Sequence, residues 1–210
     1  MKALLAAVLL SVALSAHAQT AEERLLRAID EGKQLVAEGI VARGGVKLDA
    51  RNSKNETALH LAIEKEYRQL MLMLLKAGAP VGARSANGET PLHYAALHED
   101  PWYVEELIAA HADTRARNDD GESVLQWAVM TGNGKTALHL LQRGADAKTT
   151  DVKGNTLLHA CADGGYLELA KAMISLGVDP RQRNRAGQRP LDLARERGYT
   201  ELVKYLERFQ

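Results

Sequence analysis

A leucine recurs at a constant interval along this chain, at Leu59, Leu92, Leu125, Leu158 and Leu191. The six residues around it recur as well, in the segments 57–62, 90–95, 123–128, 156–161 and 189–194. A constant period of this length is typical of a chain built from copies of one supersecondary unit. Such a unit buries its apolar face only against its neighbours. The sequence therefore predicts a solenoid, an architecture that commonly serves to bind other molecules.

The residues around the repeated leucine predict the structure of one unit. Gly, or Asn in the first full copy, precedes the motif where a left-handed backbone would close a tight turn. Thr or Ser then stands at a helix N-cap position, and Pro91 and Pro190 follow at the first helical position. A second glycine column, Gly132, Gly165 and Gly198, separates the first helix from the second. Each unit is expected to run turn, helix, helix and extended link, which makes the fold class all-α.

Thr-Pro-Leu-His-x-Ala, returning at this constant period, resembles the ankyrin repeat, and the resemblance extends from about Gln19 to Gln210. It implies an ankyrin-repeat solenoid of antiparallel helix pairs, with hairpin-like loops projecting at right angles. The loops and first helices would form a concave face of the kind that usually binds another protein. Gln126 and Asp192 depart from the pattern in the His column, and Arg189 departs in the Thr column. These departures put the motif's local hydrogen bonds in question, but not the fold.

The period divides the chain into units without an insertion. Four full units are expected at 52–84, 85–117, 118–150 and 151–183, and a truncated fifth at 184–210. One period earlier, residues 19–51 keep apolar residues on the motif's columns but lack its Thr and His. Because a terminal unit exposes one of its faces to water, we expect residues 19–51 to be a degenerate N-terminal cap repeat.

Residues 1–18 have the parts of a secretory signal peptide. Lys2 precedes an uncharged apolar run from Ala3 to Leu14, and Ala16–Ala18 supplies the small residues of a cleavage site. The run is shorter than the roughly 20 apolar residues that a membrane-spanning helix needs. We therefore expect cleavage after Ala18, no membrane insertion of the mature chain, and a protein that acts in the periplasm or outside the cell.

Charge and cysteine content narrow the classes of function. Removal of residues 1–18 takes away one lysine and no acid, which leaves 26 basic against 27 acidic residues. This balance gives no general case for nucleic acid or an anionic membrane surface as a partner. Cys161 is the only cysteine, so no internal disulfide can form. It stands in a column of alanines, where we expect a buried and unreactive thiol, and we expect the protein to be a monomer.

The histidines do not predict a metal site. His60, His93 and His159 form one column, but helices of neighbouring units pack roughly 8–10 Å apart, whereas zinc ligands lie about 2 Å from their ion. These three are expected to be buried imidazoles bonded to the turn and to the Thr three residues earlier. His98 and His111 lie off this column, and we expect them on the surface. No carboxylate pair or Ser-His-Asp arrangement can be placed, so neither a catalytic residue nor a cofactor is expected.

Loop and first-helix residues that vary between units are the candidates for contact with a partner. In the column that faces the groove, Leu97 and Met130 are adjacent apolar residues where water is expected, and we place the contact centre on them. The further candidates are Arg84, Asn87, Glu89, Arg117, Asp119, Asp120, Glu122, Lys153, Arg183 and Arg185. The arginine and glutamate columns among them allow two interpretations. They form either a solvated ladder of weak ion pairs or a basic stripe for an acidic patch on the partner, strongest near the C-terminus.

The main functional hypothesis is a non-enzymatic module that recognises a partner protein through its loop and inner-helix face, as an inhibitor, a protective factor or a stress-related factor. An enzyme or a carbohydrate-binding protein of the cell envelope is the first alternative. It would require a deep pocket with clustered acids or aromatic residues, which the sequence does not predict. The second alternative is a structural spacer without a fixed partner.

Overall fold

The structure, a computed structural model, describes residues 20–210, and the predicted signal peptide and its cleavage site lie outside the described residues. The described chain forms α-helices and ends in a 3-10 helix, η1 (Glu207–Phe209). The α-helices are α2 (Ala21–Asp30), α3 (Gln34–Arg43), α4 (Ala58–Glu64), α5 (Arg68–Lys76), α6 (Pro91–Ala96), α7 (Trp102–Ala109), α8 (Val124–Met130), α9 (Gly134–Gln142), α10 (Leu157–Gly164), α11 (Leu167–Ser175), α12 (Pro190–Arg197) and α13 (Thr200–Leu206). Within residues 20–210, every helix is too short or too polar to cross a bilayer.

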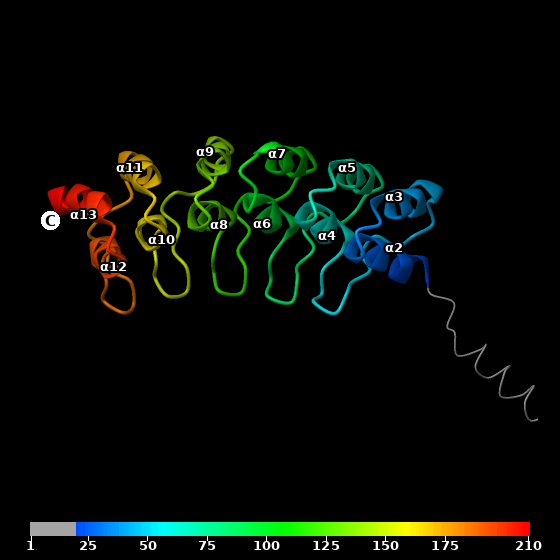
Figure 1. Cartoon of the computed structure of the whole chain (residues 1–210), viewed down its shortest axis with the longest axis horizontal. Helices are drawn as coiled ribbons and strands as arrows, with labels where there is room; N and C mark the ends of the chain where they lie inside the picture. Colours follow the sequence, from blue (N-terminus) through cyan, green and yellow to red (C-terminus); the bar gives the residue numbers. More distant parts are fainter. Residues whose placement is uncertain (1–19) are drawn as a thin grey trace, which may run out of the picture.

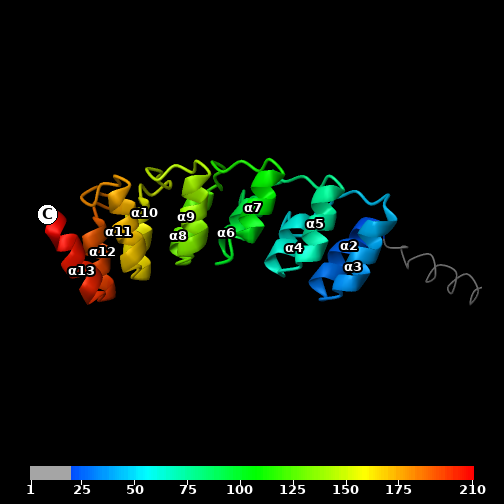
Figure 2. The ribbon, with the colours of Figure 1, turned by 90° about the horizontal axis from the view of Figure 1, so that it is seen from above.

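The helices stand in two rows along one axis (Figure 1). The even-numbered helices form an inner row, the odd-numbered ones an outer row, and long loops project beyond the inner row on the side away from the outer row. Seen from above, the helix pairs follow one another in chain order (Figure 2). The most extensive helix contacts join helices of the same pair or of adjacent pairs, such as α4 with α6 and α8 with α10. The all-α solenoid with projecting hairpin-like loops is thereby confirmed.

The repeated apolar columns form the core. The motif leucines Leu59, Leu92, Leu125, Leu158 and Leu191 are all at most 2% exposed. The small-residue column holds Ala62, Ala95, Ala128, Cys161 and Ala194, all fully buried where successive inner helices approach each other. Burying one leucine contributes about 1.5–3 kcal/mol. Each unit therefore stabilises its neighbours through a seam that it cannot bury alone.

The turn residues adopt the backbone that their positions predict. Asn55 and Gly88, which precede the motif, have φ values of 62° and 79°, in the left-handed region that favours Asn and Gly. Gly165 and Gly198 cap α10 and α12 in the same conformation, so the second glycine column does end the first helix of these units. His111 takes a φ of 68° at the end of an outer helix, where other units have glycine.

The first helix pair departs from the repeat in its starting residue. The repeat frame places the first helix of the cap at Leu25, but α2 begins earlier, at Ala21. Thr20 caps it: the Glu23 N–H donates to the Thr20 hydroxyl at 3.2 Å, and the Thr20 N–H donates to the Glu23 carboxylate at 3.3 Å. This capping box lengthens the helix and gives it a polar start.

Candidate protein-binding face

Three buried histidines connect successive loops. The Thr90 N–H donates to His93 Nδ1 at 3.1 Å, so the proton of this ring lies on Nε2, which donates to the Glu122 carbonyl at 3.3 Å. His60 bonds in the same way to Thr57 and to the Glu89 carbonyl, and His159 bonds to Thr156 and to the Gln188 carbonyl. The bond to the Thr three residues earlier was predicted and is confirmed. The predicted bond to the turn is also present, and the structure places it on the turn of the next unit, where it fixes the spacing of the loops.

Burial keeps these imidazoles neutral. Desolvation lowers the pKa of His93 to about 4, and it lowers the pKa of His60 and His159 as well. The hydrogen bond from the Thr N–H also lowers the pKa, because a proton on Nδ1 would point at the N–H group that donates to this nitrogen. The column is therefore structural, and within residues 20–210 no group of three or more His, Cys, Asp or Glu residues could hold a metal ion.

The two exceptions in the histidine column differ from each other. Asp192 replaces the ring with a carboxylate, which accepts the Arg189 N–H at 2.8 Å and pairs with the Arg189 guanidinium at 3.1 Å. Gln126 keeps the helix cap, since its own N–H donates to the Ser123 hydroxyl at 3.2 Å. However, the Gln126 side-chain oxygen is buried without a hydrogen-bond partner. The loop connection made by histidine is thus absent between the third and fourth full units.

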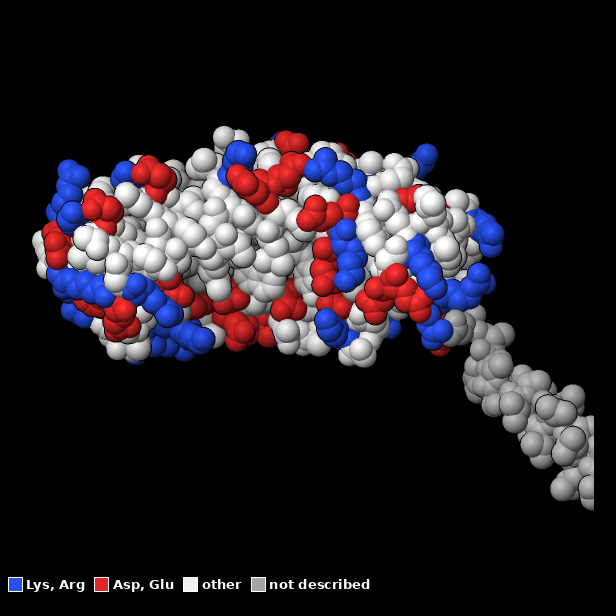
Figure 3. Space-filling view, viewed as in Figure 1, with Lys and Arg blue, Asp and Glu red and all other residues white. Residues whose placement is uncertain are grey.

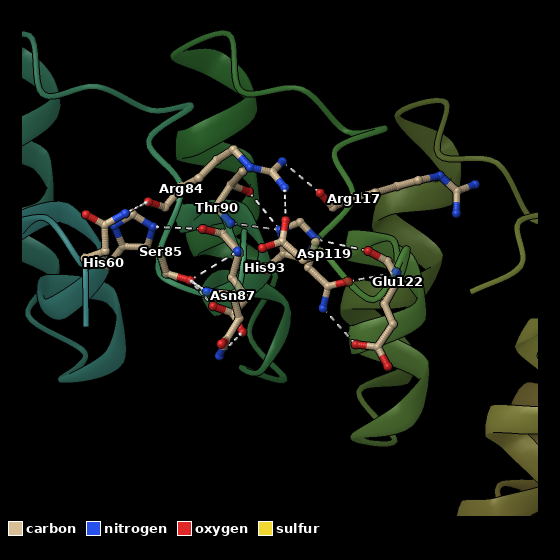
Figure 4. Close-up of polar contacts among 12 residues, drawn as sticks. His60, Arg84, Ser85, Asn87, Thr90, His93, Arg117, Asp119 and Glu122 are labelled. Atoms are coloured by element: carbon tan, nitrogen blue, oxygen red, sulfur yellow. Dashed lines mark hydrogen bonds and ion pairs between the residues drawn. The ribbon is translucent and has the colours of Figure 1, made fainter. Parts of the chain in front are cut away.

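The arginine column connects neighbouring loops through backbone carbonyls. Arg51 donates to the Arg84 carbonyl at 2.6 Å, and Arg117 donates to the Thr150 carbonyl at 2.8 Å. Between them, Arg84 donates to the Arg117 carbonyl at 2.9 Å (Figure 4). Arg84 also pairs with Asp119 at 2.9 Å. No arginine of this column pairs with the glutamate column in the described chain. Both predicted interpretations therefore miss the main role of Arg84 and Arg117, which is to hold the loops in register.

Glu89 does not project from its loop, which corrects its prediction as a contact residue. Only 8% of Glu89 is exposed, and its carboxylate accepts hydrogen bonds from Ser85 and Asn87 of the same turn. Glu122 is partly buried, and its Oε2 accepts from Asn118 at 2.9 Å and from Trp127 at 2.8 Å. The glutamates therefore stabilise the inside of the hairpins, because each buried carboxylate accepts hydrogen bonds from several donors around it.

The loop tips carry the candidates Asn87, Asp119 and Asp120, of which the last two are acidic. Asn87, Asp119 and Asp120 are all exposed, and the Asp119 N–H donates to the Asn87 carbonyl at 3.0 Å, so neighbouring tips lie side by side. The Arg84–Asp119 pair crosses directly over Gly88, where a Cβ atom would collide with both side chains. Glycine is favoured at this turn by its left-handed backbone, and a side chain there would also displace the Arg84–Asp119 pair.

Leu97 and Met130 remain exposed where the inner helices end. Leu97, the C-cap of α6, is 43% exposed, and Met130, the last residue of α8, is 46% exposed. Met130 borders a groove of about 770 Å³ that extends from the inner-helix ends to the loop tips. Glu122, Lys153 and Arg185 line the same groove. The structure thus brings four of the predicted contact residues to one hollow, with Leu97 one unit away.

Most arginines at the C-terminal end of the face lie close to acidic side chains, although the sequence indicates free positive charge there. Arg189 pairs with Asp192, Arg183 lies 4.0 Å from the same carboxylate, and Arg181 lies 3.8 Å from Asp179. Arg185 is exposed and forms no ion pair within residues 20–210. Figure 3 shows acidic side chains below the inner helices α6 to α10 and basic ones below α10 to α12. The face therefore changes sign along the array, from acidic near its middle to basic near its C-terminal end.

Three further residues, Cys161, His98 and His111, test the other sequence-based expectations. Cys161 is fully buried, as predicted, and desolvation raises its pKa to about 12, which disfavours the reactive thiolate. His111 is exposed, as predicted. His98 is not a surface residue: only 16% of its side chain is exposed, and its Nε2 lies 3.0 Å from the Ile63 carbonyl. The loop between α6 and α7 folds this ring back onto the preceding unit, which column positions alone do not reveal.

An aromatic stack lies on the inner row, where Tyr94 and Trp127 share the sequence column of Leu61 and Leu193 and pack between units as that column predicts. Tyr94 of α6 and Trp127 of α8 stack with ring centroids 6.5 Å apart and planes inclined by 28°. Their column continues as Ala160 and Leu193, and both of these line the groove. The drop in size at Ala160 was visible in the aligned units. Its consequence depends on the distance between helices, which the sequence does not give.

Comparison with known proteins agrees with this architecture. The family profile described as "Ankyrin repeats (3 copies)" matches residues 25–118, 80–151 and 125–208. The crystal structure of the ankyrin repeat domain of Bcl-3, described as a unique member of the IkappaB protein family, superposes with a TM-score of 0.73. The two chains are 30% identical over 91% of this chain and 86% of that chain. No curated protein sequence has a significant match.

Proposed function

The chain belongs to the ankyrin-repeat family, whose repeats indicate a protein–protein interaction module, and from this premise we propose that it is an exported protein that binds a partner protein through its loops and inner helices. The binding surface comprises the inner-helix ends at Leu97 and Met130, the acidic loop tips at Asp119 and Asp120, and the groove that Lys153 and Arg185 border. We call this surface the loop face. Its activity is capture of the partner, as an inhibitory or protective factor, without catalysis.

One observation carries the proposal: the large apolar side chains of Leu97 and Met130 stay exposed on the loop face, and Met130 borders the groove together with the exposed Val152. Leu97 and Met130 are 43% and 46% exposed, although the inner helices bury almost every other apolar residue. Protein interfaces combine a small apolar centre with a polar rim, and Met and Arg are enriched in them. The change of charge sign along the loops would orient a partner of complementary charge.

The matched test compares two double substitutions in the purified protein. Leu97→Glu with Met130→Glu changes the loop face, whereas Leu138→Glu with Leu176→Glu changes the outer row, where Leu138 and Leu176 are 47% and 46% exposed. The proteins are used as baits in a periplasmic extract, and bound proteins are identified by mass spectrometry. We expect the partner to be lost from the loop-face variant and kept by the outer-row variant.

Two outcomes count against this proposal. Equal capture by both variants would exclude Leu97 and Met130 as the contact centre. Absence of any saturable partner, with an unchanged phenotype after the loop face is scrambled, would favour a structural spacer. Charge reversal at Arg84 and Arg117 is a poor probe, because both side chains hold the loops in register.

Export and oligomeric state are proposals with their own tests. Processing at the predicted site gives a mature chain that begins at Gln19, which N-terminal sequencing of the protein from a periplasmic fraction detects. An unprocessed chain in the cytoplasmic fraction would contradict export. The buried seams are covered within one chain, so we expect size-exclusion chromatography with light scattering to give the mass of a monomer.

A further inference from the structure

The groove lies where the repeat lacks two of its own rings. Tyr94 packs edge-on against His60 of the preceding unit, with centroids 5.1 Å apart at 77°, and Trp127 packs against His93 at 5.4 Å and 81°. At the next interface these two positions hold Gln126 and Ala160, so neither the imidazole nor the aromatic ring is present. Both residues line the groove of about 770 Å³. This hollow is the volume that a ring at the third position of the stack would enter.

The hollow also contains two hydrogen-bond acceptors without donors. Tyr94 donates its hydroxyl to Glu56 Oε1 of the preceding unit at 2.6 Å. Glu122 stands in the same relation to Ala160 as Glu56 does to Tyr94. Its Oε2 accepts from Asn118 and Trp127, while its Oε1 forms no hydrogen bond within residues 20–210. The second acceptor is the Gln126 side-chain oxygen, which belongs to a residue that is only 1% exposed and has no partner.

The open charges at the rim of the hollow are positive. Lys153 and Arg185 are exposed and form no ion pair with any residue in the range 20–210. Three acids line the same hollow, and Glu122 keeps one free oxygen there among the described residues. Asp163 pairs with Arg197 at 2.7 Å, and Asp151 accepts hydrogen bonds from Asn155. A ligand therefore meets apolar walls, the open Glu122 carboxylate oxygen, the buried Gln126 amide oxygen and two cations without ion pairs in the described chain.

We propose that this hollow is a tyrosine pocket, which takes a tyrosine side chain from an acidic segment of the partner. The ring fills the empty place above Ala160, and the positive edge of the ring faces the Gln126 oxygen. The hydroxyl donates to Glu122 Oε1, as that of Tyr94 does to Glu56. Acidic residues beside the tyrosine reach Lys153 and Arg185. This inference rests on the proposed function, because it specifies the chemistry of the partner at the loop face.

The test is a fluorescence titration of the purified protein with labelled pentapeptides. The probe peptide is Asp-Asp-Tyr-Asp-Asp, and its controls carry Phe or Ala in the central position or Lys in place of every Asp. One hydrogen bond to a carboxylate corresponds to about a tenfold preference for Tyr over Phe. We expect the Ala and Lys peptides to lose binding, and the Tyr peptide to weaken as salt is raised.

Two substitutions in the protein assign this binding to the hollow. Ala160→Trp fills the hollow with the chain's own ring and should abolish binding of the Tyr peptide. Ala109→Trp places the same ring on the exposed surface of α7 and should leave binding unchanged. Glu122→Gln should reduce the preference for Tyr over Phe to about threefold, since a neutral amide oxygen accepts about half as strongly as a carboxylate. Circular dichroism verifies that each variant keeps its helices.

Several results would overturn the tyrosine pocket. Equal binding of the Tyr and Ala peptides would do so, and so would unchanged binding after Ala160→Trp. Binding of N-acetyltyrosinamide as tight as that of the peptide would also do so, because it would identify a small phenol as the occupant. The peptide assay needs no partner, so its failure is separate from failure of the capture experiment. A partner that is captured through Leu97 and Met130 and is retained after Ala160→Trp would refute the pocket alone.

Discussion

The neutral His93 ring predicts that the protein loses stability as the pH falls below 6.5. The pKa of His93 is about 4 in the folded chain, against an ordinary value of 6.5, because the ring is buried. The unfolded chain therefore binds a proton between pH 6.5 and 4 that the folded chain does not. The stability that the neutral ring provides is present above pH 6.5 and is lost towards pH 4. By linkage, His93 alone lowers the free energy of unfolding by about 2 kcal/mol between pH 8 and pH 5.

His93→Gln is the perturbation that isolates this effect. Glutamine does not titrate, and Gln126 already occupies the same column in the next unit. At pH 8 the variant should be less stable by about 1–3 kcal/mol, because the Thr90 and Glu122 groups lose their buried partner. Between pH 8 and pH 5, however, it should lose about 2 kcal/mol less than the parent protein.

Urea unfolding followed by circular dichroism at pH 8, 7, 6 and 5 measures both quantities. The variant keeps part of the pH dependence, since burial also lowers the pKa of His60 and His159. Parallel curves of unfolding free energy against pH for parent and variant would refute the argument. They would mean that His93 binds its proton equally well in the folded and unfolded chains.

Three further predictions test the fold. Arg117→Ala removes hydrogen bonds to the Gly121 and Thr150 carbonyls and should lower the free energy of unfolding in urea by about 1–2 kcal/mol. The control Arg115→Ala removes no side-chain hydrogen bond and should change this free energy little. Equal losses in the two variants would contradict the loop-bridging role of Arg117. Cys161 should not react with a thiol reagent at pH 8 until the chain unfolds, and rapid labelling of the folded protein would contradict its burial. Leu125→Ala should lower the free energy of unfolding by about 2–5 kcal/mol, because it opens a cavity in the core. Leu138→Ala on the surface should lower it by less than about 0.5 kcal/mol. A small loss at Leu125 would show that the seam between units is loosely packed.

The fold was predictable because each copy of the motif repeats the same local chemistry. A leucine that returns at the same position of every unit requires the same burial each time, and the Thr and His of the motif predicted the helix cap that the structure shows at His60, His93 and His159. Turn glycines were readable from their conformational freedom alone. These features depend on neighbours within one unit, which a single sequence contains.

The candidate site was less predictable because it depends on contacts between units. A loop arginine such as Arg84 has the sequence signature of an exposed charge, yet it bridges to a carbonyl in the next unit. Glu89 is buried because Ser85 and Asn87 fold around its carboxylate. The groove above Ala160 follows from two small changes at one interface, and its volume depends on the helix spacing.

The most direct measurement of the central claim is amide hydrogen exchange of the protein with and without its captured partner. If the loop face binds, exchange slows in the loops around Asn87, Asp120 and Lys153 and along the inner helices α6, α8 and α10. Exchange in the outer helices α7, α9 and α11 then stays unchanged. Slower exchange confined to those outer helices would contradict the claim and place the partner on the opposite side of the array.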